Sequence, residues 1–317
     1  MSKRLYHICY TSHQEVLCRN FRDYSMMFNC IAQAVFNTGS NLLAHSIMST
    51  HVHLICESGD ASGLVKRIRS SYTQMFNHRY RRAGRLGEES FFCDRLEGRH
   101  HITAAISYVM RNPWHHEVCA NPYAYPFSSI GHYFKNSLDR FLPMAGSDIR
   151  KNSKSDIIRD KNIIPGHIKV SLSSGMIRVC DVIDSIMVEG YFGSYRAFIY
   201  GLSRNDYEKW EKEQCSDNVA AMPVTIRTVE PFLSEDKVVA IMRQNPHWLK
   251  EKRITDIELC DIIDHSYIPR LGKSGYAELT EKEIYSIRRH LFQSLSMKVS
   301  SNQLDRCLPC HSSRGGK

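Results

Sequence analysis

The sequence predicts an α+β fold, in which an antiparallel sheet with helices is followed by a mostly α-helical C-terminal region. Two observations support this. In the first 135 residues, short apolar runs alternate with longer segments of helical periodicity, whereas helical periodicity predominates beyond residue 166. A chain of 317 residues is long enough for two domains that each bury a core. We expect one domain over residues 1–135, a linker over 136–165, which is rich in polar residues, and a second domain over 166–317.

The elements of the first domain follow in a recognisable order. We expect strands at residues 5–10, 42–48, 51–56 and 90–93 and a helix over 19–36, ended by the turn residues 37–40. A second helix starts from Asp60 or Ser62 as N-cap, and a short third helix over 104–112 should end before Pro113. The order strand, helix, strand, strand, helix, strand, helix is that of a ferredoxin-like α+β sandwich.

The most informative motif is Thr50-His51-Val52-His53-Leu54-Ile55. Successive side chains of a strand point to opposite faces, so His51 and His53 project to the same side of the predicted strand. Two neighbouring imidazoles can hold one metal ion, although a half-buried strand also carries histidines for packing alone. The motif therefore gains weight only from a second element.

That second element is the helix before Pro113. Tyr108 lies near its last turn, and Asn112, four residues later, falls on the same face. A histidine pair on a strand and a tyrosine with an amide on a helix end can meet around one metal ion. His51, His53, Tyr108 and Asn112 are thus the candidate site residues.

A basic stretch lies between these two elements. Residues 66–85 contain no Asp or Glu, and apolar residues at helical spacing give the segment a second, polar face. The net charge of +9 favours a polyanionic partner such as nucleic acid. A solvated basic face is the simpler interpretation, but this position suits a surface that follows DNA phosphates. Its cations are Lys66, Arg67, Arg69, Arg79, Arg81, Arg82 and Arg85.

In order and spacing, residues 1–135 resemble the single-tyrosine HUH transposases (histidine, hydrophobic, histidine), and among them the REP-associated tyrosine transposases. The resemblance is carried by His51-Val52-His53-Leu54, by the basic segment 77–84, by Tyr108 in Ser-Tyr-Val-Met-Arg-Asn-Pro and by the segment 122–129. It implies the HUH endonuclease fold, with the histidine strand central in the sheet. Arg111 and Trp114-His115-His116 depart from the family, which more often has aliphatic or small residues there.

The resemblance implies an enzyme that nicks single-stranded or hairpin DNA at palindromic repeats and transfers the strand. Tyr108 is then the nucleophile that forms a 5′-phosphotyrosine, since a covalent intermediate conserves the bond energy. His51 and His53, with Asn112 as third ligand, are expected to hold a divalent metal, Mg²⁺ or Mn²⁺. Tyr72 and Tyr80 compete as nucleophiles because both lie near the basic surface, although Tyr72 falls on the apolar stripe.

Two other functions remain open. One is a catalytically silent DNA-binding regulator on the same fold, and the other is a metal-independent RNA-binding module, which usually has an aromatic-rich strand. Whether the chain is a monomer or a homodimer also remains open. The N-terminus has no long apolar segment, and no run is long enough to span a membrane, so we expect a cytoplasmic protein with reduced cysteines and no membrane partner.

The end of the chain contains two further motifs. A helix near 280–295, a break and a short helix from Ser300 predict a helix-turn-helix within 280–308, with a plain helical hairpin as the alternative. Further helices are expected near 182–189, 195–200 and 235–243. The motif Cys307-Leu308-Pro309-Cys310-His311 matches c-type haem attachment, which requires export; adventitious metal binding is the preferred interpretation.

Overall fold

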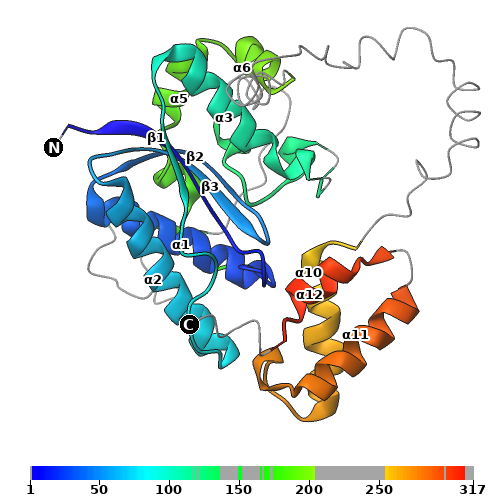
Figure 1. Ribbon diagram of the computed structural model, residues 1–317. Helices are drawn as coiled ribbons and strands as arrows, with labels where there is room; N and C mark the ends of the chain where they lie inside the picture. The colour runs from blue at the N-terminus through cyan, green and yellow to red at the C-terminus, as the bar shows by residue number, and fades with distance from the viewer. Residues whose placement is uncertain are drawn as a thin grey trace, which may run out of the picture.

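The structure is a computed structural model that describes residues 2–116, 118–119, 121–135, 149–151, 165, 168–171, 174–203, 254–295 and 298–310. Its centre is a four-stranded antiparallel sheet with the strand order β2-β3-β1-β4 (Figure 1). The strands are β1 (Arg4–Thr11), β2 (Asn41–Ile47), β3 (His51–Ser58) and β4 (Phe92–Arg95). Together with its two intervening helices, this unit has the β-α-β-β-α-β order that the sequence predicts.

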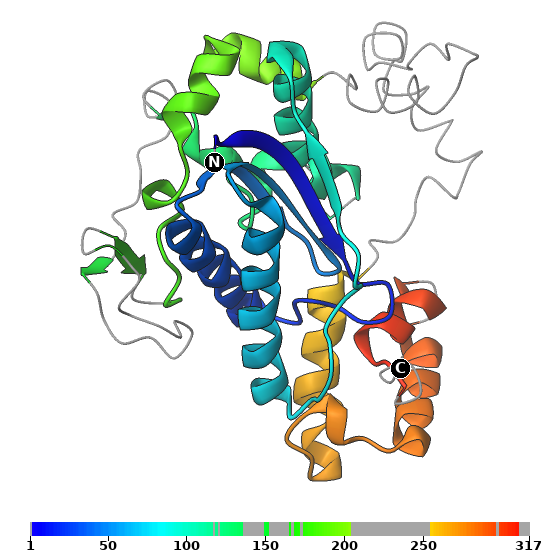
Figure 2. The same cartoon turned by 60° about the vertical axis from the view of Figure 1, so that its left-hand side comes forward.

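The two faces of the sheet have different partners. Helices α1 (Phe21–Thr38) and α2 (Ala61–Tyr80) cover one face, and α3 (Gly98–His115) lies across the other (Figures 1 and 2). Because side chains alternate along a strand, Val52 and Leu54 of β3 point toward α1 and α2. His51 and His53 point toward α3, and β1 pairs with β3 in a register that puts Cys9 opposite His53.

Local sequence determines where the first two helices begin and end. The side chain of Asn20 accepts hydrogen bonds from the backbone N–H groups of Arg22 and Asp23 at the start of α1, and Gly39 ends this helix in the left-handed conformation. For α2, the structure selects Asp60 from the two expected N-caps. An apolar stripe of α2 that includes Leu64 and Ile68 is fully buried, as the periodicity predicts.

Helix α3 does not end before Pro113, and this part of the prediction is wrong. The helix continues to His115, and the N–H of His116 still donates to the carbonyl of Asn112 at 3.1 Å. A proline removes one backbone donor and disfavours the helical conformation of the residue before it. Residues 109–113 are buried, so packing against the sheet overrides this local preference.

Residues 174–203 also pack onto the sheet and α3. The backbone N–H of Asp184 donates to the carbonyl of Leu42 on β2 at 2.8 Å, and α5 (Ser185–Phe192) and α6 (Tyr195–Leu202) lie beside α3 (Figure 1). These are the helices expected near 182–189 and 195–200. A small antiparallel pair, β5 (Ile149–Lys151) and β6 (Lys169–Ser171), precedes them. Most of the predicted linker, 136–165, lies outside the described residues.

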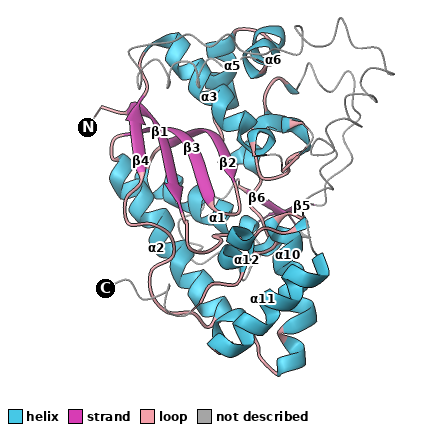
Figure 3. Ribbon diagram, turned by 45° about the vertical axis from the view of Figure 1, so that its right-hand side comes forward, coloured by secondary structure: helices cyan, strands magenta, loops and turns pink. Residues whose placement is uncertain are grey.

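The helical unit at the end of the chain consists of α10 (Asp256–Ile262), α11 (Glu281–Leu295) and α12 (Ser301–Cys307), with a π-helical turn at Ile263–Tyr267 (Figure 3). Helix α11 is the one expected near 280–295, whereas the helix expected at 235–243 falls outside the described residues. A helix-turn-helix role for α11 and α12 stays a prediction. Cys307, the first cysteine of the haem-like motif, is fully buried.

One arginine joins this helical unit to the loop before α1. The side chain of Arg19 is fully buried; it forms an ion pair with Asp264 at 2.7 Å and donates to the carbonyl of Cys307 at 2.6 Å. Its guanidinium also lies 4.0 Å from the centre of the Tyr276 ring. These contacts seat the C-terminal unit against the loop between β1 and α1. Among the described residues, no helix is both long and apolar enough to cross a lipid bilayer.

Candidate active site

The structure brings together all four candidate site residues, two from β3 and two from α3. Nε2 of His51 lies 2.8 Å from the side-chain oxygen of Asn112, and the side-chain nitrogen of Asn112 lies 3.2 Å from Nε2 of His53. The ring of Tyr108 is perpendicular to that of His53, with 5.4 Å between the ring centres. Residues as far as 61 positions apart in the sequence therefore form one cluster on the face of the sheet under α3.

Hydrogen-bond chemistry assigns a direction to this cluster. The amide oxygen of Asn112 can only accept and its nitrogen can only donate, so Nε2 of His51 donates to the oxygen and Nε2 of His53 accepts from the nitrogen. His53 then has its proton on Nδ1, which donates to Nε2 of His7 at 3.1 Å. Thr50 lies 3.1 Å from Nδ1 of His51 and can donate or accept there. This chain fixes the orientation of both imidazoles.

Burial keeps these imidazoles neutral at physiological pH. It lowers the pKa of His51 to about 4, although the hydrogen bond with Asn112 opposes this shift and the nearby His116 and His13 add to it. Burial, reinforced by His7, His51 and His116, lowers the pKa of His53 well below its usual value. Neutral imidazoles have the lone pair that metal coordination requires.

The sequence prediction missed three members of the cluster. His7 stacks on His53 with 5.3 Å between ring centres, and burial lowers its pKa to about 3. Cys9 has its sulfur 3.7 Å from Nε2 of His53. His116 packs against His51 with 4.9 Å between ring centres. The pairing of β1 with β3 is what reveals His7 and Cys9. His116 was missed because α3 was expected to end at Asn112, three residues before its actual end.

The two competing tyrosines lie on the opposite face of the sheet. Both belong to α2 and are buried. The hydroxyl of Tyr72 donates to the carbonyl of Leu17 at 2.5 Å, and that of Tyr80 donates to Asp23 at 2.8 Å. Burial raises the pKa of both hydroxyls. Tyr72 is a core residue, as its place on the apolar stripe indicates, and neither hydroxyl contacts the histidine cluster.

Most cations of the predicted basic surface form ion pairs or hydrogen bonds with other groups of the same chain. Arg82 is buried and forms an ion pair with Glu15. It therefore does not belong to the exposed basic surface, contrary to the expectation from the sequence. Arg69 donates to the carbonyls of Glu88 and Glu89. Arg79, Arg81 and Arg85 pair with Asp23, Glu278 and Glu89 respectively. Lys66 and Arg67 are exposed, and neither forms an ion pair within the described part of the chain.

The donor set of the cluster suits a divalent ion with mixed nitrogen and oxygen ligands. No group of three or more His, Cys, Asp or Glu side chains in the described ranges is arranged to hold a metal. The cluster instead has two imidazole nitrogens that both lie within hydrogen-bonding distance of one amide, that of Asn112. Two imidazoles and an amide oxygen match the nitrogen and oxygen preferences of Mn²⁺ and related ions.

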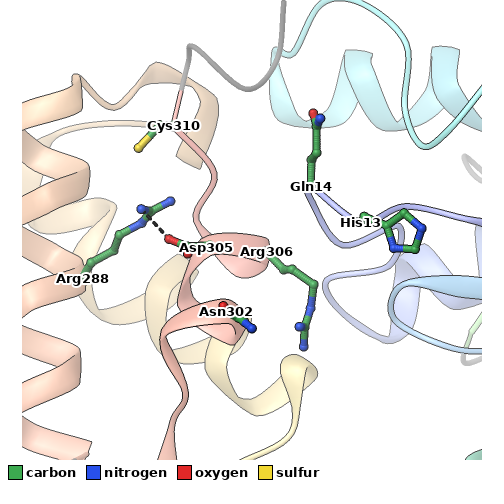
Figure 4. Close-up of a pocket in the computed structure, with 7 residues that line it drawn as sticks. All are labelled: His13, Gln14, Arg288, Asn302, Asp305, Arg306 and Cys310. Carbon is green, nitrogen blue, oxygen red and sulfur yellow. Dashed lines mark ion pairs between the residues drawn. The ribbon is translucent and has the colours of Figure 1, made fainter. Parts of the chain in front are cut away.

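A pocket of about 450 Å³ lies between the loop at His13 and the C-terminal unit (Figure 4). His13, in its lining, follows Thr11 by two residues, and Thr11 pairs with His51 in the sheet. Arg288 and Arg306 also line the pocket, but Arg288 pairs with Asp305 at 2.6 Å and Arg306 with Asp256 at 3.5 Å. These carboxylates offset the positive charge of the pocket, so we assign no ligand to it.

Comparison with known proteins gives a similarity only among solved structures. No family model matches the chain, and no curated protein matches it. Among solved structures, the chain is similar to a structure described as the REP-associated tyrosine transposase bound to a REP hairpin, with 15% sequence identity and a TM-score of 0.37. The similarity covers 51% of this chain and 92% of that chain.

Proposed function

We propose that this protein is a metal-dependent nuclease and strand transferase that cleaves single-stranded DNA through a covalent bond to Tyr108. The observation that carries the proposal is the convergence of His51 and His53 on the Asn112 amide, with the Tyr108 ring against His53. This constellation has a candidate nucleophile beside a candidate metal site, an arrangement that suits metal-assisted phosphodiester transesterification. The resemblance of residues 1–135 to single-tyrosine HUH transposases specifies the class of reaction.

In this proposal the hydroxyl of Tyr108 attacks the scissile phosphorus. The bond from phosphorus to the 3′ oxygen breaks, leaving a 5′-phosphotyrosine and a free 3′ hydroxyl; attack by a 3′ hydroxyl on that intermediate reseals the strand and returns the proton to Tyr108. Helix α3 holds Tyr108 and Asn112 one turn apart, so both side chains reach the same face. His7 holds the proton of His53 on Nδ1 and leaves Nε2 facing the site.

His51, His53 and Asn112 are the residues proposed to hold a divalent ion, Mg²⁺ or Mn²⁺. When bound, such an ion would offset the negative charge that develops on the scissile phosphate. His51 now donates from Nε2 to Asn112, so it must shift its proton to Nδ1 to become a ligand. The hydroxyl oxygen of Thr50 lies 3.1 Å from Nδ1 of His51 and can accept a hydrogen bond from the protonated Nδ1.

Exposed aromatic side chains beside the cluster suit unpaired bases. Phe92 is 49% exposed, and its ring lies 5.3 Å from that of His7. Trp114 on α3 is 43% exposed and follows Asn112 by two residues. Stacking on aromatic rings is the usual way in which proteins hold single-stranded bases. The substrate proposed is therefore an unpaired segment, as beside a hairpin stem, with REP-like palindromes as the natural source.

A gel assay for a covalent protein–DNA adduct tests this function. Hairpin oligonucleotides with single-stranded flanks are incubated with the protein and Mn²⁺, and wild type is compared with Tyr108→Phe. We expect an adduct that depends on the metal and is absent from Tyr108→Phe. Tyr123→Phe is a matched control, since Tyr123 is exposed and lies outside the cluster.

Each alternative predicts a different result in the same assay. An adduct that persists in Tyr108→Phe would move the nucleophile to another residue and overturn our assignment. Tight hairpin binding with no adduct in any variant would instead favour the catalytically silent regulator. Preferential binding of RNA would favour an RNA-binding module.

A further inference from the structure

Helices α5 and α6 lie beside α3 (Figure 1). A second, smaller pocket is lined by residues of these three helices. Its volume is about 190 Å³. Arg99, Ala104 and Ser107 line it from α3, and Tyr191, Tyr200 and Gly201 line it from α5 and α6. None of these residues belongs to the cluster of His51, His53, Tyr108 and Asn112.

The lining combines a cation, aromatic rings and a buried hydroxyl. Nε of Arg99 donates to the carbonyl of Tyr191 at 2.7 Å, and no carboxylate pairs with Arg99 in the ranges that the structure describes. Tyr200 is 61% exposed at the pocket. The hydroxyl of Ser107 is buried and has no hydrogen-bond partner among the residues that the structure describes. A buried polar atom without a partner is unfavourable, so a ligand that hydrogen-bonds to it would gain affinity.

Gly201 keeps the pocket open. A Cβ atom at this position would lie 3.0 Å from the hydroxyl oxygen of Ser107 and 3.1 Å from the ring of Phe192. Both distances are shorter than ordinary van der Waals contact, so a larger residue would push into the space beside Ser107. The absence of a side chain at Gly201 leaves space directly beside the buried hydroxyl of Ser107, at the inner wall of the pocket.

The pocket is close to the proposed nucleophile along the same helix. Ser107 directly precedes Tyr108, and Ala104 lies one turn before it, so the pocket begins where the Tyr108 face of α3 ends. A DNA strand held at Tyr108 can therefore place a neighbouring nucleotide in the pocket. The pocket and the cluster thus suit two positions on one DNA strand.

We infer that this pocket binds one unpaired nucleotide of the DNA strand, its base against Tyr191 and Tyr200 and its phosphate at Arg99. A guanidinium without a carboxylate partner attracts phosphate, and tyrosine rings stack with bases of any sequence. The hydroxyl of Ser107 can hydrogen-bond to the edge of the base and so favour some bases over others. The inference rests on the proposed function, because it specifies how that site selects its substrate.

Binding measurements with pocket variants test the inference. In a Tyr108→Phe background, which prevents adduct formation, fluorescence anisotropy reports the affinity for a labelled hairpin with a single-stranded flank. We expect Arg99→Ala and Tyr200→Ala each to weaken binding by about tenfold, the scale of one stacked base or one charged contact. Ala197→Leu, which fills the pocket from an exposed position, should do the same. Arg196→Ala is the matched control, since it removes an exposed cation from α6 outside the pocket.

Scanning the flank with abasic nucleotides identifies the bound position. One abasic site should weaken binding to wild type and have no effect in Tyr200→Ala. Equal affinities for Arg99→Ala, Tyr200→Ala and Arg196→Ala would overturn the inference, even if Tyr108 forms an adduct and the proposed function stands. Binding of free deoxynucleoside monophosphates to the pocket, with unchanged hairpin affinity in all variants, would also overturn it and indicate a small-molecule site.

Discussion

The side-chain oxygen of Asn112 lies 2.8 Å from Nε2 of His51. This contact links the histidine strand to the tyrosine helix, and it is made through an amide that also donates to His53. Asn112 is fully buried, so its orientation is determined by the two imidazoles and the surrounding helix. One amide therefore positions both proposed metal ligands, and it is itself the third proposed ligand.

The first prediction concerns this amide. Asn112→Ala should weaken Mn²⁺ binding by about tenfold or more, because it removes an oxygen ligand and leaves two imidazoles without their partner. Asn112→Asp, which retains an oxygen at the same place, should restore much of the affinity. Isothermal titration calorimetry with Mn²⁺ measures both, and Asn302→Ala, at an exposed position, is the control. Equal affinities in all four proteins would exclude a metal at this cluster.

The second prediction concerns acid sensitivity. His45 is fully buried on the α1 face of the sheet, and neither ring nitrogen has a hydrogen-bond partner within the described ranges. Burial, together with His132, lowers the pKa of His45 to about 3. Because the unfolded chain takes up a proton below pH 6.5 and the folded one does not, His45 lowers stability as pH falls from 7 toward 3. Between pH 7 and pH 5 this amounts to about 2 kcal/mol.

His45→Leu should therefore have a free energy of unfolding about 1 kcal/mol higher than wild type at pH 7, because two unpaired nitrogens are removed. Between pH 7 and pH 5, the free energy of unfolding of His45→Leu should also fall by about 2 kcal/mol less than that of wild type. Urea unfolding at both pH values measures this. A variant that is less stable than wild type at pH 5 would show that His45 has a partner beyond those of this structure.

The third prediction concerns the joint between the C-terminal unit and the rest. Arg19→Ala leaves Asp264 and the Cys307 carbonyl without their partner, and loss of one member of a buried ion pair costs about 3–5 kcal/mol. Arg19→Met with Asp264→Leu should recover part of that loss. Hydrogen exchange of residues 254–310 should increase in Arg19→Ala and remain unchanged in the control Arg270→Ala. Unchanged exchange in Arg19→Ala would contradict the contact.

The fourth prediction separates exposed from buried cations of the basic stretch. Lys66→Ala with Arg67→Ala should reduce the dependence of DNA affinity on salt, with the log–log slope falling by about 1.5 if each side chain contacts one phosphate. Arg82→Ala should leave that slope unchanged and instead lower stability by about 3 kcal/mol, because Glu15 loses its buried partner. A slope that is the same in wild type and the double variant would remove Lys66 and Arg67 from the DNA surface.

The sequence predicts the strands of the sheet and the side chains that share a face of one element, because both depend on local periodicity. Alternation along 51–56 gives the shared face of His51 and His53, and helical spacing gives that of Tyr108 and Asn112. Pairing between distant segments is not local, and so the contributions of His7 and Cys9 were missed. The carboxylate partners of the arginines are likewise distant: Glu278 pairs with Arg81 across 197 positions. Spacing alone therefore overestimated the free positive charge of α2.

The most direct test of the central claim is to identify the amino acid and the DNA end that join in the adduct. The protein is incubated with a hairpin oligonucleotide and Mn²⁺, digested with trypsin and nuclease, and analysed by tandem mass spectrometry. We predict a nucleotide attached through its 5′ phosphate to Tyr108, in the peptide between Arg99 and Arg111. A nucleotide on Tyr72, Tyr80 or any other residue, or one attached through a 3′ phosphate, would contradict the account.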